Sequence, residues 1–320
     1  MERLERAEQL VTVFGGGGFI GRYVCEQLLK RGVRIRVAAR EPRCAHYIQP
    51  LGQVGQVGYV RADLTRPASI APAVDGSTAV INLCGVLKGS FTATHVEGAK
   101  ALAEAAAAEG AQALVHVSAI GADPASDSAY GRSKGEGEQA VRSAFPGATI
   151  IRPSLVFGPE DELTNRFAGL AKLPFLPVIA ASTKFQPVYV RDLAQAIATA
   201  TLHPEEHAGK TYEIGGPEVM SMKELHHAIL ELTGQEPELV EMPGFMASLL
   251  SRFGWLPGAP LTRDQWLMLQ RDNVTAEGVS GLDAFGIQPT PLGAVGHEWL
   301  GRFHQGGRFA GRRINLTATN

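Results

Sequence analysis

The chain has 320 residues, of which 45% are hydrophobic and 19% are charged. This composition is typical of a globular protein and excludes disordered, collagen-like and coiled-coil classes. The 30 Lys and Arg residues against 32 Asp and Glu residues give a net charge of -2, so no overall positive field indicates a nucleic-acid partner.

Three cysteines, an odd number without the spacing of metal ligands, predict buried thiols in a reducing compartment and no metal site; they are Cys25, Cys44 and Cys84. No run approaches the roughly 18 apolar residues that a membrane-spanning helix needs. We therefore expect a cytoplasmic protein, which would contact the inner face of the membrane only as a peripheral protein.

The first half of the chain alternates strands and helices. A strand over residues 10–14 precedes a helix over 19–30, where Ile20, Val24 and Leu28 have helical spacing and Gly32 follows the end. Further strands are predicted over 33–39, 57–61, 79–83, 113–117 and 148–151, with helices over 92–109 and 128–145. This alternation predicts an α/β fold, the doubly wound parallel sheet of the Rossmann type, with its ligand crevice at the carboxyl ends of the strands.

After residue 152 Pro and Gly interrupt the pattern repeatedly. We predict a dinucleotide-binding domain over residues 1–155, rejoined by about 185–214. A smaller, interleaved C-terminal domain is predicted over 156–184 and 215–320. A strand over 185–190 and a helix over 192–202 look regular enough to rejoin the main sheet.

Four consecutive glycines follow the first strand and fit both G-x-G-x-x-G and G-x-x-G-x-x-G. Either spacing lets the backbone approach a pyrophosphate and directs a helix N-terminus at it. The preceding strand and the following helix favour this interpretation over a plain glycine-rich turn. The predicted phosphate-binding residues are Gly15, Gly16, Gly17, Gly18, Phe19, Ile20 and Gly21.

The end of the second strand distinguishes the two nicotinamide cofactors. A carboxylate there would bind a free ribose 2′-hydroxyl, whereas Arg40 is suited to the 2′-phosphate of NADP(H). We predict NADP(H); Glu41 beside it favours NAD(H), and a surface salt bridge for Arg40 stays open. Asp63, at the end of the third strand, could accept a hydrogen bond from adenine or act as a turn residue.

Tyr130 and Lys134 stand four residues apart in a predicted helix, which places both side chains on one face. A nearby ammonium would lower the phenol pKa from about 10, so that Tyr130 could exchange a proton with a substrate oxygen during hydride transfer. An exposed helix pair without a catalytic role is the alternative.

These motifs, with three others in the family's order, resemble the extended or atypical branch of the short-chain dehydrogenase/reductase superfamily over about residues 10–235. The stretches are 15–21, Asp63, 82–86, 115–118, 130–134 and 151–158. The resemblance implies that Tyr130, Lys134 and Ser118 are catalytic and that Arg152, Pro153 and Ser154 lie beside the nicotinamide. The remaining cofactor-binding residues are expected at Leu64, Leu83, Cys84, Gly85 and Val117.

One position departs from this pattern. Active extended members usually carry a catalytic Ser or Thr about two residues after the position of Ser118, where this chain has Ile120. Because Ile cannot donate a hydrogen bond to a substrate carbonyl, either Ser118 substitutes for it or the dehydrogenase chemistry is weak or lost.

Within the superfamily the chain resembles the nucleotide-binding accessory subunit of respiratory complex I and its bacterial relatives. The stretches that carry this likeness are 11–15, 21–24, 116–119, 186–192 and 269–274. The likeness implies tight NADPH binding in a structural role near a membrane. The alternatives are an active NADP-dependent reductase or epimerase/dehydratase that uses Tyr130 and Lys134, and a sensor that reports the NADP(H) state to a partner.

The segment from Pro243 to Pro257 carries apolar residues at helical spacing, namely Phe245, Met246, Leu249, Leu250, Phe253 and Leu256. It is too short to cross a bilayer but is suited to a lipid surface or to a respiratory-complex subunit. The tail that follows is basic, with Arg302, Arg308, Arg312 and Arg313. Such a tail is suited to anionic head groups. A core helix and a solvated tail remain the alternatives.

Overall fold

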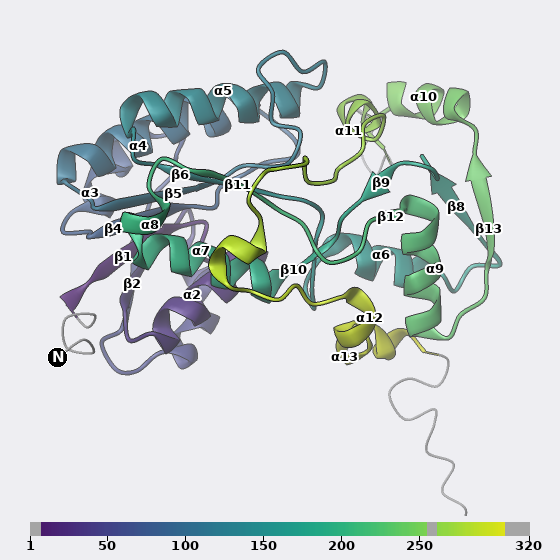
Figure 1. Ribbon diagram of the computed structural model, residues 1–320, viewed down its shortest axis with the longest axis horizontal. Helices are drawn as coiled ribbons and strands as arrows, with labels where there is room; N and C mark the ends of the chain where they lie inside the picture. Colours follow the sequence, from purple (N-terminus) through teal and green to yellow (C-terminus); the bar gives the residue numbers. More distant parts are fainter. Residues whose placement is uncertain (1–7, 255–260, 305–320) are drawn as a thin grey trace, which may run out of the picture.

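The computed structural model describes residues 8–254 and 261–304. Its centre is one sheet of seven parallel strands in the order β11-β6-β5-β4-β1-β2-β3 (Figure 1). The strands are β1 (Leu10–Phe14), β2 (Arg34–Ala39), β3 (Val57–Arg61), β4 (Ala79–Asn82), β5 (Ala113–Val117), β6 (Thr149–Pro153) and β11 (Thr211–Ile214). The predicted doubly wound fold is confirmed, with the reversal of strand order between β1 and β4.

Helices cover both faces of this sheet, so its central strands β4 and β5 are buried along their whole length (Figure 1). On one face α2 (Phe19–Lys30) packs against α7 (Val190–Leu202). On the other face lie α3 (Ala71–Val74), α4 (Gly98–Glu109) and α5 (Ala129–Ala144). A 3-10 segment (Pro42–Leu51) follows β2, and a π-helix (Thr92–Glu97) precedes α4.

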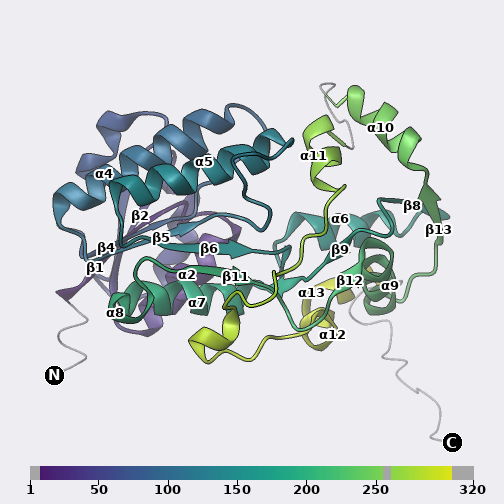
Figure 2. The same ribbon diagram turned by 45° about the horizontal axis from the view of Figure 1, so that its top comes forward.

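A second lobe lies beyond the carboxyl edge of the sheet, to the right in Figures 1 and 2. It contains the parallel pair β8 (Phe175–Ile179) and β13 (Glu238–Met242). Its helices are α6 (Glu162–Leu170), α9 (Met222–Thr233), α10 (Gly244–Arg252), α11 (Arg263–Met268), α12 (Leu292–Val295) and α13 (His297–Leu300). The short helix α8 (Pro204–His207) stays beside the main sheet (Figure 1).

The segment expected to rejoin the sheet as one strand over 185–190 does not do so. It is divided into β9 (Lys184–Phe185), which pairs with β12 (Met220–Ser221), and β10 (Val188–Tyr189), which pairs with β7 (Val156–Phe157). Pro187 lies between the two halves and has no N–H group for a continuous ladder. Helix α7 and strand β11 rejoin the main sheet instead, and the predicted domain boundaries stay a prediction.

Candidate functional site

The glycine turn between β1 and α2 leaves no room for side chains. Gly15 has a φ of 79°, and its carbonyl oxygen accepts a hydrogen bond from the Gly18 N–H group at 2.9 Å. A Cβ at Gly21 would overlap that same oxygen. No side chain caps α2 at Gly18, so the N–H groups of its first turn are left for an anionic ligand.

Arg40 and Asp63 lie near each other at the ends of β2 and β3. Arg40 is exposed and makes no ion pair with any residue in the described ranges, so the salt-bridge alternative has no support there. One carboxylate oxygen of Asp63 accepts hydrogen bonds from the N–H and the hydroxyl of Thr65, at 3.0 and 2.8 Å. These bonds, with Arg40 and Arg66 nearby, hold the pKa of Asp63 below its usual value although burial opposes this. Asp63 therefore makes the turn that we gave as its alternative role.

Tyr130 and Lys134 share one face of α5, as predicted, but the electrostatics differ from expectation. The Lys134 ammonium donates to the Val117 carbonyl at 3.1 Å, and burial lowers its pKa to about 8. Burial raises the pKa of Tyr130 to about 12. The expected lowering of the phenol pKa is wrong, because burial disfavours the charged phenolate and raises the pKa instead.

Ser118 and Ile120 lie on the loop that leaves β5. Ser118 is 4% exposed, and its hydroxyl has no hydrogen-bond partner among the described residues. Ile120 is held by its backbone, since its N–H group donates to the Pro153 carbonyl at 3.1 Å. The Ser118 hydroxyl is therefore a buried polar group to which a bound ligand could supply the missing hydrogen-bond partner.

Two predicted nicotinamide neighbours have side chains that are bonded elsewhere. The Arg152 guanidinium makes two hydrogen bonds to Glu138, at 2.7 and 2.9 Å, and a third to Glu213 at 3.4 Å. Ser154 donates to the backbone and side-chain oxygens of Asn273, both at 2.8 Å. Both side chains are thus bonded within the protein, and their place beside a nicotinamide stays a prediction.

The loop after β4 carries Leu83, Cys84 and Gly85 past Lys134. A Cβ at Gly85 would lie 3.6 Å from the Lys134 ammonium nitrogen, and burial raises the pKa of the Cys84 thiol to about 12. Leu64, Val117 and Pro153 are buried at neighbouring strand ends. These positions place the remaining predicted cofactor residues along one edge of the sheet, and their roles stay predictions.

The sequence did not indicate His95, which lies on the π-helix Thr92–Glu97. One ring nitrogen of His95 accepts from the Val86 N–H group at 3.0 Å, and the other lies 2.9 Å from the Ser133 hydroxyl. Burial, with Lys134 nearby, lowers the His95 pKa to about 3, so the ring is neutral. Its ring also contacts Tyr130 edge-on, at 5.5 Å between centroids. The feature that distinguishes His95 is its place on a π-helix, and a π-helix cannot be predicted from the spacing of residues in the sequence.

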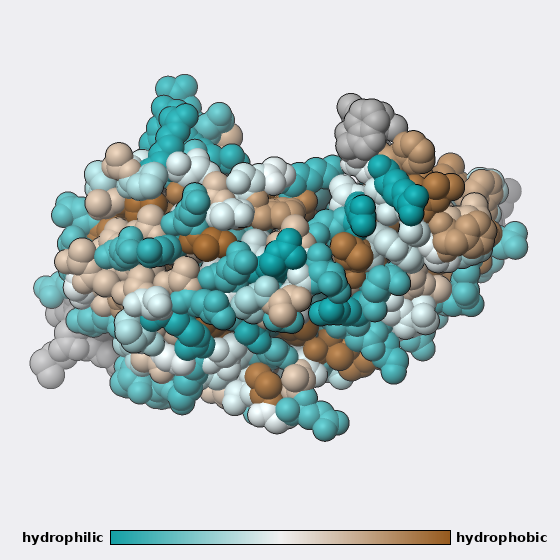
Figure 3. Space-filling model, turned by 90° about the horizontal axis from the view of Figure 1, so that it is seen from above, coloured by the Kyte–Doolittle hydropathy of each residue, from teal (hydrophilic) through white to brown (hydrophobic). Residues whose placement is uncertain are grey.

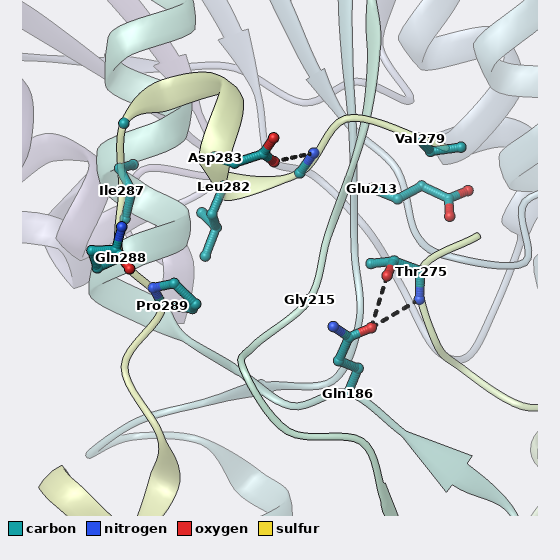
Figure 4. A pocket seen from close by; sticks show the side chains of 12 residues that line it. Gln186, Glu213, Gly215, Thr275, Val279, Leu282, Asp283, Ile287, Gln288 and Pro289 are labelled. Atoms are coloured by element: carbon teal, nitrogen blue, oxygen red, sulfur yellow. Dashed lines mark hydrogen bonds between the residues drawn. The ribbon is translucent and has the colours of Figure 1, made fainter. Parts of the chain in front are cut away.

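A separate pocket of about 400 Å³ lies beside β11 (Figure 4). Gln186 faces into it, and its side-chain oxygen accepts from the hydroxyl and the N–H group of Thr275, at 2.8 and 3.1 Å. Glu213 lines the same pocket and is already bonded to Arg152 and to the N–H of Ala276. None of the glycine-turn, Arg40, Tyr130 or Lys134 groups lines it, so it is not the dinucleotide crevice.

Residues 11–215 match the model of the NAD dependent epimerase/dehydratase family. The chain belongs to this family. The fold is accordingly an NAD(P)-binding fold, without a choice between the two nucleotides. The superfamily resemblance predicted from the motifs is confirmed.

Two relatives show how far the likeness extends. The chain is 34% identical over 320 residues to NADH dehydrogenase (ubiquinone) 1 alpha subcomplex subunit 9, mitochondrial, of Rattus norvegicus, covering 96% of this chain and 84% of that one. It is 30% identical over 242 residues to the ceramide reductase of Caulobacter vibrioides, covering 74% of each. The first alignment confirms the predicted relationship to the complex I subunit.

A solved structure has the same fold. The NADPH-dependent quinone oxidoreductase QOR2 of Escherichia coli, complexed with NADPH, superimposes with a TM-score of 0.71 at 18% identity, over 90% of this chain and 99% of that chain. At this identity the likeness concerns the fold alone. Within the described residues, no helix has the length and apolar character to cross a bilayer.

Proposed function

We propose that this protein binds NADP(H) as a resident ligand and serves as an accessory subunit or assembly component of a respiratory NADH:ubiquinone oxidoreductase. The observation that carries the proposal is the contrast within the crevice. The glycine turn leaves the first N–H groups of α2 without a side-chain cap and suited to a phosphate, whereas near Tyr130 the chain has Ile120 where a hydroxyl donor is expected and Ser154 bonded to Asn273. Such a site retains a nucleotide without activating a carbonyl.

The choice of NADP(H) rests on Arg40. Its guanidinium has no acidic partner among residues 8–254 and 261–304, and Arg40 directly follows β2, the strand whose end contacts the adenine ribose in folds of this type. A guanidinium pairs with a phosphate through two charge-assisted hydrogen bonds. One oxygen of the nearby Asp63 carboxylate is bonded to Thr65, and Arg40 lies close enough to contribute to the lowered pKa of Asp63.

The partner is proposed from the relatives and from α10. The relative from Rattus norvegicus is named as a subunit of NADH dehydrogenase. Helix α10 exposes apolar side chains, namely Phe245 (74%), Met246 (48%) and Leu249 (54%), followed by Phe253 (52%). Hydrophobic residues gather at this end of the molecule (Figure 3). A partner subunit or the membrane surface beside it would cover them.

The basic tail belongs to the same proposal. Arg302 bonds to the Asn165 side-chain oxygen at 2.5 Å and lies over the Phe303 ring. Leu256 and the other three arginines, Arg308, Arg312 and Arg313, lie outside the described residues. Within the described residues, the structural support for the proposed membrane contact therefore comes from the exposed apolar side chains of α10.

Mass spectrometry of the native protein tests the proposal. Protein purified at low salt should carry one NADP(H) per chain and should fractionate with subunits of the respiratory complex and with membranes. Protein that carries no nucleotide, or carries NAD(H) alone, contradicts the cofactor proposal. Nucleotide-loaded protein that never associates with the complex contradicts the accessory role and leaves nucleotide binding in place.

The second candidate is an active NADP-dependent reductase. The observation that favours it is the unpartnered Ser118 hydroxyl beside an intact Tyr130 and Lys134 pair. The relative from Caulobacter vibrioides, named ceramide reductase, makes long-chain carbonyl compounds the first substrates to try. Under this candidate, Tyr130→Phe should abolish NADPH oxidation and leave nucleotide binding unchanged; turnover that survives the change contradicts it.

A further inference from the structure

Residues 262–273, which we call the strap, run from the second lobe across the loop between β5 and α5. Asp264 of the strap binds the first turn of α5, more than 130 residues earlier in the chain. One carboxylate oxygen accepts from the Ala129 N–H at 2.6 Å, and the other accepts from the Tyr130 N–H at 3.1 Å. The residue that the family places at the reacting centre is therefore held through its own backbone by a distant carboxylate.

Asp264 and Ser128 together complete the N-terminus of α5. The Ser128 hydroxyl donates to Asp264 at 3.1 Å and accepts from the Gly131 N–H at 3.2 Å. The three N–H groups of the first turn are thus all bonded, two of them by a residue that does not belong to the helix. A negative charge at this end also interacts favourably with the helix dipole.

The other end of the strap holds the start of the same loop. Asn273 donates to the Ile120 carbonyl at 3.4 Å, and its oxygens accept from Ser154. Arg271 pairs with Asp127 at 3.4 Å, and both side chains are well exposed, so this ion pair contributes little. The loop from Ile120 to α5 is therefore bridged at both ends.

We infer that Asp264 is a positioning residue for Tyr130, and that the strap makes the order of the nicotinamide end of the crevice depend on the second lobe. Removing the carboxylate would release the first turn of α5 and with it the Tyr130 side chain. The inference concerns the site of the proposed nucleotide, but the contact itself exists without a ligand.

The strap also connects this clamp to the exposed face of α10. The ring of Trp266 lies 3.7 Å from where a Cβ of Gly244 would be, and a Cβ at Gly254 would touch Thr262 and Leu261. The strap thus packs against α10 at its start and against α5 through Asp264. Any partner that moves α10 would act on the element that holds Tyr130.

The test compares four single variants with the full-length wild type. Asp264→Ala removes the clamp, and Asp264→Asn keeps one acceptor oxygen and should restore part of the effect. Asp272→Ala is the matched control, because the Asp272 carboxylate accepts from the Lys184 N–H at 2.8 Å and is bonded to β9 rather than to α5. A fourth variant, Ser221→Ala, removes the N-cap of α9 and serves as a purely structural loss.

Two measurements decide the question. Amide hydrogen exchange over residues 128–134 should be about tenfold faster in Asp264→Ala and unchanged in Asp272→Ala, in protein without nucleotide. Dissociation of NADPH, followed by its own fluorescence, should be several-fold faster in Asp264→Ala and unchanged in Ser221→Ala. Unchanged exchange over 128–134, or equally fast NADPH release from Ser221→Ala, overturns the inference. If the wild type binds no nucleotide, the proposed function fails, whereas the exchange measurement still tests the clamp.

Discussion

The two ends of the crevice are built in different ways. At the phosphate end, residues 15–21 lie next to one another in the chain, and the site is made by backbone geometry within one turn. At the Tyr130 end, the groups come from β5, α5, the π-helix and the strap, which are brought together only by the complete fold. The glycine turn is therefore a local structure, whereas the order of the Tyr130 end depends on contacts between distant parts of the chain.

The difference extends to the polar groups. The first turn of α2 has no side-chain cap, so its N–H groups are available to an anion. In the first turn of α5 the N–H groups donate hydrogen bonds to Ser128 and Asp264. Lys134 is likewise bonded to Val117. One helix N-terminus is open to a ligand, and the other is closed by the protein itself.

Gly21→Ala should break the phosphate end, with the largest effect that we expect. The new Cβ would overlap the Gly15 carbonyl and the backbone of Gly16, which cannot move without opening the turn. We expect a loss of about 3 kcal/mol in the free energy of unfolding and no measurable NADPH binding. Gly293→Ala, where a Cβ meets nothing within 4 Å, is the control. Equal stability of the two variants in urea would contradict this account of the turn.

The acid stability of the protein should report on the Tyr130 end. Burial lowers the pKa of both His95 and His116 to about 3, so each must gain a proton when the chain unfolds below its ordinary pKa of about 6.5. Their contribution to stability is complete above pH 6.5 and decreases as the pH falls toward 3, by up to about 1.4 kcal/mol per pH unit for each ring.

His95→Gln should remove one of these two contributions. Between pH 6.5 and 5 the variant should lose about 2 kcal/mol less stability than the wild type, as measured by urea unfolding. Parallel pH profiles for variant and wild type would mean that His95 is not the buried, neutral ring described above.

Local features of the fold could be predicted from the sequence, and long-range partners could not. The bounds of β1, α2, β3 and β5 follow from apolar runs and glycines within a few residues, and the structure reproduces them. The side chains of Arg152 and Ser154 are bonded to Glu138 and Asn273, which are 14 and 119 residues away in the chain. Periodicity carries no information about such pairs. The pKa of Tyr130 was misjudged for the same reason, because burial depends on the entire fold.

Arg40→Ala should sharpen the comparison by changing which nucleotide the phosphate end prefers. Loss of the guanidinium should weaken NADPH binding about tenfold, near 1.4 kcal/mol, and leave NADH binding almost unchanged. Arg34→Ala is the control, because Arg34 is exposed at the opposite end of the same strand. Titration of both nucleotides against both variants gives the answer, and an equal loss for NADPH and NADH would exclude a 2′-phosphate contact.

Phe245→Ser with Leu249→Ser should have the smallest effect on the protein itself. Both side chains are more than half exposed on α10, so the free energy of unfolding should change by less than about 0.5 kcal/mol and NADPH affinity should not change. Association with the respiratory complex, or with vesicles that contain anionic lipid, should fall because the apolar contact is lost. Ser248→Ala on the same helix is the control for the change of composition. A double variant that sediments with membranes as well as the wild type does would show that α10 is not the docking face. The nucleotide site would then be the one region for which a binding partner is still proposed.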